Sequence, residues 1–255
     1  MEDYMYSKKT MPIVAFITLL LISLACNAVS PRITTESIST VAPSSANETQ
    51  SPPQSNPTPI PNPVIDLQVG NYTNYRDIID SLWFVGEIVN NGNAAQSVQV
   101  VISLIDSNGS IVGTGSDTIT YVSGSGKAPF KILVDNAPSE WAEVKIQIQG
   151  ELYSENGLFA PYIDLQVDNV SGKVGDYGGY TLTGSVKNTG SKTASLVYVS
   201  AVAYDTSGNV IDVGWTYATL NEIAPNGDSP FSLDFSNLTS APASYEVFAV
   251  SSFAE

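Results

Sequence analysis

Hydrophobic residues recur at every second position in several segments of the chain after residue 63. A period of two is typical of a strand that buries one face, because successive side chains point to opposite sides of a sheet. No window shows the 3.6-residue period of an amphipathic helix. The positions predicted to face inward are Leu82, Phe84, Gly86 and Ile88; Val98, Val100, Ile102 and Leu104; and Phe130, Ile132 and Val134.

The same pattern occurs twice. The sequence IDLQV at 65–69 returns unchanged at 163–167, and GEIVNNG at 86–92 returns as GSVKNTG at 184–190. The inward positions of the second copy are Tyr180, Leu182, Gly184 and Val186; Val197, Val199, Ala201 and Ala203; and Phe231, Leu233 and Phe235. A repeat of about 100 residues has the size of a domain and exceeds that of a solenoid turn. We therefore expect two modules, residues 64–154 and 161–255, with a short joining segment between them.

Turn sequences such as Asn-Asn-Gly and Ser-Asn-Gly separate the predicted strands. Asparagine and glycine favour the tight turns that connect antiparallel neighbours. Six or seven short strands in about 90 residues indicate an immunoglobulin-like sandwich. The predicted fold class is thus all-β, with two such sandwiches in tandem.

The modules also resemble a known family. Gly86–Gly92, the strand ending in Ile102-Ser-Leu-Ile-Asp106, and the later Pro129-Phe130 are similar to the FxLYD module of prokaryotic surface proteins, and the CARDB-type adhesion module has a related appearance. In the second copy the naming motif stands as Ala201-Val-Ala-Tyr-Asp205. The resemblance implies a β-sandwich with an extracytoplasmic role, and it supplies no catalytic residues.

Residues 1–26 have the organisation of an export signal. Lys8 and Lys9 precede an uncharged stretch from Met11 to Leu24, which is short for a membrane-spanning helix. The following Ala25-Cys26 resembles the end of a bacterial lipobox, which implies that lipid is attached to Cys26 and that the protein is held on the extracytoplasmic face of a membrane. The alternative is a short N-terminal transmembrane anchor. Cys26 is the only cysteine, so the sequence offers no disulfide.

Residues 27–63 differ in composition from the rest of the chain. Of these 37 residues, 26 are Ser, Thr, Pro, Asn or Gln, and none is aromatic. Such a segment buries too little apolar surface to offset its chain entropy. We expect a disordered tether between the membrane and the modules.

The amino-acid composition and the net charge exclude several classes of function. The chain has no histidine, which removes Ser-His-Asp relays and His-ligated metals. Its net charge of −15 opposes binding to nucleic acid. We expect no enzyme activity, no cofactor and no metal.

Three motifs suggest other chemistry. Gly124-Ser-Gly126-Lys127 has part of a phosphate-loop pattern but is followed by Ala-Pro, so it predicts a hairpin loop. The loops at Asp106 and Asp205 each offer one acid to calcium, which needs six to eight oxygens, and a tight turn explains them equally. Asn-x-Ser/Thr sequons occur at Asn47, Asn71, Asn108, Asn169 and Asn237.

Aromatic residues outside the inward pattern are the better indication of a binding site. Tyr72 and Tyr75 are expected in the loop after the first strand, Tyr177 in the corresponding loop of the second module, and Trp215 and Tyr217 where the first module has Ser116 and Thr118. Exposed Tyr and Trp provide contact area to sugars or proteins at low entropic cost. The alternative is that they cap the ends of the sandwiches.

Together these features predict a non-catalytic, lipid-anchored envelope protein whose tandem modules bind a protein or a glycan. The alternative is an inert structural stalk, or an assembly subunit of an envelope complex, with no ligand of its own.

Overall fold

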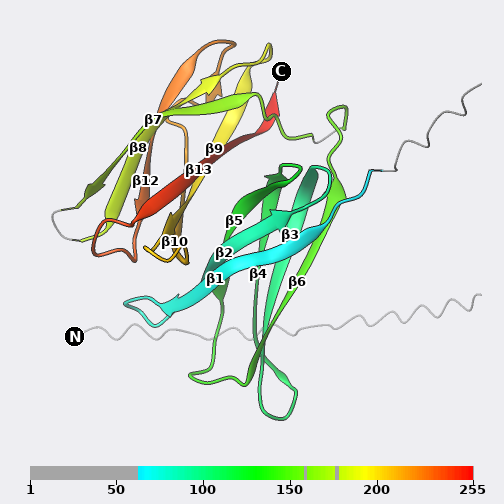
Figure 1. The fold of residues 1–255 in the computed structure, drawn as a ribbon, viewed down its shortest axis with the longest axis vertical. Helices are drawn as coiled ribbons and strands as arrows, with labels where there is room; N and C mark the ends of the chain where they lie inside the picture. Colours follow the sequence, from blue (N-terminus) through cyan, green and yellow to red (C-terminus); the bar gives the residue numbers. More distant parts are fainter. Residues whose placement is uncertain (1–62, 158–159, 176–177, 255) are drawn as a thin grey trace, which may run out of the picture. The chain divides into compact units, whose positions relative to one another are not determined.

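The computed structural model describes residues 63–157, 160–175 and 178–254. These residues form thirteen strands and no helix, so the all-β prediction is confirmed. Figure 1 shows the strands in chain order. They are β1 (Leu67–Arg76), β2 (Leu82–Asn90), β3 (Ala95–Ile105), β4 (Ile111–Val122), β5 (Gly126–Val134), β6 (Glu143–Leu152), β7 (Leu165–Val174), β8 (Tyr180–Asn188), β9 (Ala194–Tyr204), β10 (Val210–Tyr217), β11 (Glu222–Ile223), β12 (Asp228–Phe235) and β13 (Ser244–Ala254).

Strands β1–β6 form two three-stranded antiparallel sheets, in the orders β1-β2-β5 and β4-β3-β6. Strands β7–β13 repeat this arrangement with the sheets β12-β8-β7 and β10-β9-β13. The short β11 pairs with β9 beyond the end of β10, where β4 of the first copy is one continuous strand. We call β1–β6 the first sandwich and β7–β13 the second.

Each sandwich has its own hydrophobic core between its two sheets. Phe84, Ile102 and Ile132 have no exposed surface in the first core, and Leu182 and Val199 have none in the second. These residues come from facing sheets and occupy the positions that the period of two assigns to the interior. The positions predicted to face inward are therefore confirmed as buried, except Gly184, which is half-buried.

The repeated glycine in β2 and β8 makes room for a phenylalanine on the neighbouring strand. Gly86 pairs with Phe130, and a Cβ atom on Gly86 would lie 2.6 Å from that ring. Gly184 pairs with Phe231, and its Cβ would lie 2.7 Å from the ring. Only glycine leaves space for the ring to cross the strand, which explains why the two residues recur together in both copies.

The repeated asparagine at the end of the same strands fixes the following turn. The buried Asn90 side chain donates to the carbonyls of Asn93 (2.7 Å) and Ser123 (3.1 Å) and accepts from the amide of Gly92 (3.0 Å). The buried Asn188 makes the corresponding bonds within the second sandwich. Each amide thus links the end of a strand in one sheet, β2 or β8, to the facing sheet, at Ser123 directly after β4 or at Ile223 in β11.

The described residues belong to one compact unit. Within the part of the chain that the structure describes, no helix has the length and apolar character needed to cross a membrane. The export signal, most of the tether and Cys26 lie outside the described residues.

Candidate functional site

The aromatic candidates do not form one group. Tyr72 and Tyr75 lie within strand β1 and not in the loop after it, because β1 continues to Arg76, so that part of the prediction is wrong. Tyr72 is 44% exposed, with its ring 6.4 Å from that of Phe84. Tyr177 lies outside the described residues.

Trp215 and Tyr217 meet a third ring on the adjacent strand. Tyr198 of β9 stacks on Trp215 with ring centroids 5.8 Å apart and packs edge-on against Tyr217 at 5.7 Å. The strand register places Trp215 opposite Ser200 and Tyr217 opposite Tyr198, as Ser116 and Thr118 lie opposite Val101 and Gln99 in the first sandwich. Trp215 is 54% exposed and Tyr217 52%. We call these three residues the aromatic platform.

Tyr198 is the member that the sequence pattern did not identify. It is outward-facing, between the buried Val197 and Val199, and a tyrosine at such a position was a usable signal. Burial, together with the nearby charge of Asp117, raises the pKa of the Tyr198 hydroxyl, so it stays protonated at neutral pH.

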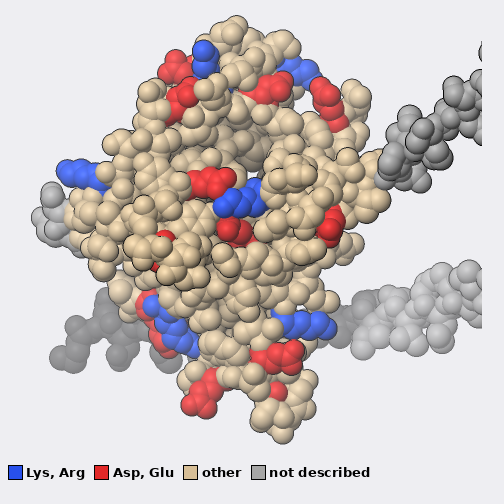
Figure 2. Space-filling model, viewed as in Figure 1, with Lys and Arg blue, Asp and Glu red and all other residues tan. Residues whose placement is uncertain are grey.

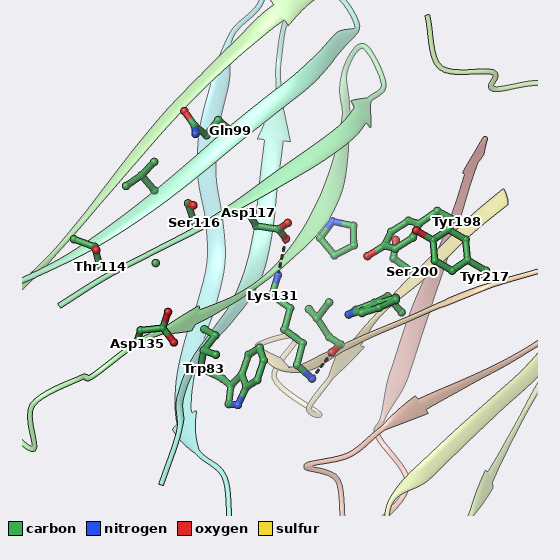
Figure 3. A pocket seen from close by; sticks show the side chains of 16 residues that line it. Trp83, Gln99, Thr114, Ser116, Asp117, Lys131, Asp135, Tyr198, Ser200 and Tyr217 are labelled. Carbon is green, nitrogen blue, oxygen red and sulfur yellow. Dashed lines mark hydrogen bonds between the residues drawn. The ribbon is translucent and has the colours of Figure 1, made fainter. Parts of the chain in front are cut away.

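The platform lines a recess of about 770 Å³ between the two sandwiches. Figure 3 shows that Tyr198, Ser200 and Tyr217 approach it from the second sandwich, while the first contributes polar side chains on the other side. The polar residues of the first sandwich are Gln99, Thr114, Ser116, Asp117, Lys131 and Asp135. A concave site of this size with a few convergent polar groups is typical of small-ligand binding.

The recess exists because the outer faces of two sheets pack together beside it. Val85 of the first sandwich is fully buried against Val202, Val210 and Val213 of the second. The second sandwich has Thr183 at the position that corresponds to Val85, and the first sandwich has Ser103 at the position that corresponds to Val202. The contact is thus made by residues in which the two repeats differ.

A buried ion pair crosses this junction. The Lys131 ammonium donates to the fully buried Asp212 carboxylate at 3.2 Å and to the carbonyl of Val213 at 2.8 Å. Tyr75 donates its hydroxyl to the same Asp212 oxygen at 3.1 Å. Burial raises the pKa of Tyr75, and the charge of Asp212 raises it further. The sequence prediction treated Tyr75 as a ligand contact, whereas here it joins the two sandwiches.

A second polar group crosses the junction at Lys127, the lysine of the Gly-Ser-Gly-Lys motif. Its ammonium lies 2.8 Å from Glu87 and 2.7 Å from Glu246, and it donates to the Tyr204 hydroxyl at 2.6 Å. Burial lowers the pKa of Lys127, but the hydrogen bonds to Glu246, Glu87 and Tyr204 outweigh this and raise it overall. The motif forms the hairpin between β4 and β5, and its lysine, Lys127, forms ion pairs with carboxylates of the protein itself.

The two aspartate loops use their carboxylates to close turns. Asp106 accepts backbone hydrogen bonds from Asn108 and Ser110, both at 2.9 Å, and these lower its pKa. Asp205 makes the equivalent bonds at 2.8 Å. Among the described residues, no three acidic, cysteine or histidine side chains gather as metal ligands. The four described sequon asparagines are exposed.

On the face shown in Figure 2, basic side chains are scattered among acidic ones and form no continuous patch.

A scan of protein-family models and a search of curated proteins gave no match. Among solved structures, the chain is similar to the crystal structure of red sea bream transglutaminase, with 13% sequence identity and a TM-score of 0.21 over 72% of this chain. The chain spans 31% of the length of that transglutaminase. A similarity at this level carries no argument about fold or chemistry.

Proposed function

We propose that the protein is a non-catalytic, lipid-anchored component of the cell envelope that binds a glycan in the recess between its sandwiches. The observation that carries the proposal is the aromatic platform, which leaves more than half of the Trp215 side chain exposed while Tyr198 stacks on it. A preformed indole surface of this kind accepts the apolar face of a sugar ring at little entropic cost.

The polar groups around the platform support the same ligand class. Gln99, Thr114, Ser116 and Asp117 offer both donors and acceptors to hydroxyl groups within one recess. Ligand sites typically combine such an apolar surface with a few polar groups that fix orientation.

We further propose that both sandwiches are immunoglobulin-like. The sheet orders β1-β2-β5 and β4-β3-β6 correspond to strands A-B-E and C′-C-F of that fold, without a strand G. The same orders occur in the second sandwich, which supports the tandem arrangement expected from the repeat.

Replacing Trp215 with alanine tests the binding proposal. On a glycan array and then by calorimetry, the full chain in detergent should bind a defined oligosaccharide, and Trp215→Ala should weaken that binding about tenfold or more, since about 1.4 kcal/mol of lost stacking corresponds to a factor of ten. The matched control is Phe253→Ala, because Phe253 is 48% exposed on β13 and does not line the recess. Absence of any glycan binding would favour the inert stalk, and equal losses in both variants would remove the platform from the proposal.

Replacing Cys26 with alanine tests the anchor. Without the thiol no lipid can be attached, so the variant should move from the membrane fraction to the soluble fraction on cell fractionation. Retention of Cys26→Ala in the membrane would instead support the N-terminal transmembrane anchor.

A further inference from the structure

The recess does not end at the aromatic platform. A second recess of about 350 Å³ continues along the junction, lined by β4 and β5 of the first sandwich and by β13 of the second. Five residues line both recesses, which makes them parts of one groove. These residues are Asp117, Pro129, Tyr198, Ser200 and Tyr217.

Both parts of the groove have volumes within the roughly 300–1,000 Å³ typical of ligand sites. The platform residues Tyr198 and Tyr217 stand at their shared boundary, where a sugar stacked on the platform would have space on either side. A groove with a binding surface in its middle suits an extended chain better than a compact ligand.

The charges in the groove restrict the chemistry of that chain. Asp117 and Asp135 line the first recess, and among the described residues neither carboxylate lies within 4 Å of the charged side-chain nitrogen of a lysine or arginine. Among the described residues, the hydrogen-bond donors to the Asp117 carboxylate are two backbone amides, that of Thr118 at 2.7 Å and that of Lys131 at 3.3 Å.

The two lysines that line the groove, Lys127 and Lys131, already form ion pairs with carboxylates of the protein. Lys131 is paired with the buried Asp212, and Lys127 lies between Glu87 and Glu246. An anionic ligand would meet unpaired carboxylates and find no free cation, and like charges brought together in a partly desolvated site are strongly unfavourable.

We propose that the ligand is a linear oligosaccharide of neutral or amino sugars that spans both recesses, and that the groove rejects acidic glycans. This inference rests on the proposed glycan binding and adds the length and the charge of the ligand. The second recess is a subsite of its own, and Asp117 is the specificity-determining residue at the boundary.

The test uses calorimetry with defined probes on the full chain in detergent. The probes are the dimer to hexamer of β-1,4-linked N-acetylglucosamine, the same series of glucose, the glucosamine hexamer and the galacturonate hexamer. We expect affinity to rise at least tenfold from dimer to hexamer in a neutral series, and the galacturonate hexamer to bind at least tenfold more weakly than the neutral hexamer.

Two variants separate the parts of the proposal. Ser252 is exposed and lines only the second recess, so Ser252→Trp should fill that recess and reduce hexamer affinity to that of the dimer. Ser232→Trp, at an exposed position on β12 outside the groove, is the matched control and should change nothing. Asp117→Asn should reduce the discrimination against galacturonate.

The outcomes are distinguishable. Trp215-dependent binding with no dependence on length or on Ser252→Trp overturns the second subsite but leaves glycan binding in place. Equal affinity for acidic and neutral hexamers overturns the charge selectivity. If no probe binds, or if a protein occupies the groove instead, both the inference and the proposed function fail.

Discussion

Replacing Asp212 with alanine should lower the free energy of unfolding by about 3–5 kcal/mol, the range for breaking a buried ion pair from one side. Asp212 is fully buried and is contacted by Lys131, Tyr75 and the amides of Val213 and Asn237. Its loss leaves the Lys131 ammonium, whose side chain is largely buried, with a single carbonyl acceptor, that of Val213. Urea denaturation at neutral pH measures the effect.

The control for this variant is Asp228→Ala, because Asp228 is exposed at the start of β12. Its removal should change the free energy of unfolding by less than about 0.5 kcal/mol, as is usual for surface sites. Joint replacement of Lys131 by methionine and Asp212 by leucine should recover part of the loss, since apolar pairs often substitute for buried ion pairs. A loss below about 1 kcal/mol for Asp212→Ala would mean that the junction contributes little to stability.

Replacing Asn90 with alanine should cost about 3 kcal/mol, and Asn188→Ala should cost a similar amount in the second sandwich. Each substitution removes the partner of two carbonyls and one backbone amide, and also that of the Asp66 amide for Asn90 or of the Tyr162 hydroxyl for Asn188. A polar group left unsatisfied in a buried position costs about 1–3 kcal/mol, and water can reach part of these partly buried groups. Thermal unfolding followed by circular dichroism checks both variants.

Asn91→Ala is the matched control, because the adjacent Asn91 side chain is exposed. It should unfold within a degree or two of the parent. Equal shifts for Asn90→Ala and Asn91→Ala would show that the turn does not depend on the buried amide. The comparison also tests the role of the asparagine that ends the repeated segments GEIVN (86–90) and GSVKN (184–188), in which the glycine leaves space for an aromatic ring and the asparagine fixes a turn.

The interior of each sandwich was predictable because a single physical rule governs it. Side chains alternate across a strand, so Phe84 and Leu182 could be assigned to a core from their phase alone. The buried amides could be located as a repeated motif, but their role depends on carbonyls far away in the sequence, such as Ser123 for Asn90. No local pattern encodes such a partner.

The alternation of side chains across a strand does not predict the junction between the two sandwiches. Val85 and Val202 occupy the outward phase and are nevertheless fully buried. The signal was present in the uninterrupted apolar runs Leu82–Val85 and Ala201–Tyr204, since a strand covered on both faces loses its alternation. The groove depends on this junction, so the sequence could identify two residues of the aromatic platform but not Tyr198, the recess or its charges.

The unlike faces that meet at the junction also limit how many modules can associate. A contact between two different surfaces of a repeated unit is head-to-tail, and such contacts extend into open filaments whenever every copy carries both surfaces. Here the second copy has Thr183 where the first has Val85, and the first has Ser103 where the second has Val202. Val85 and Val202 contact each other within one chain, so this pair is not left over for a head-to-tail contact with a further copy.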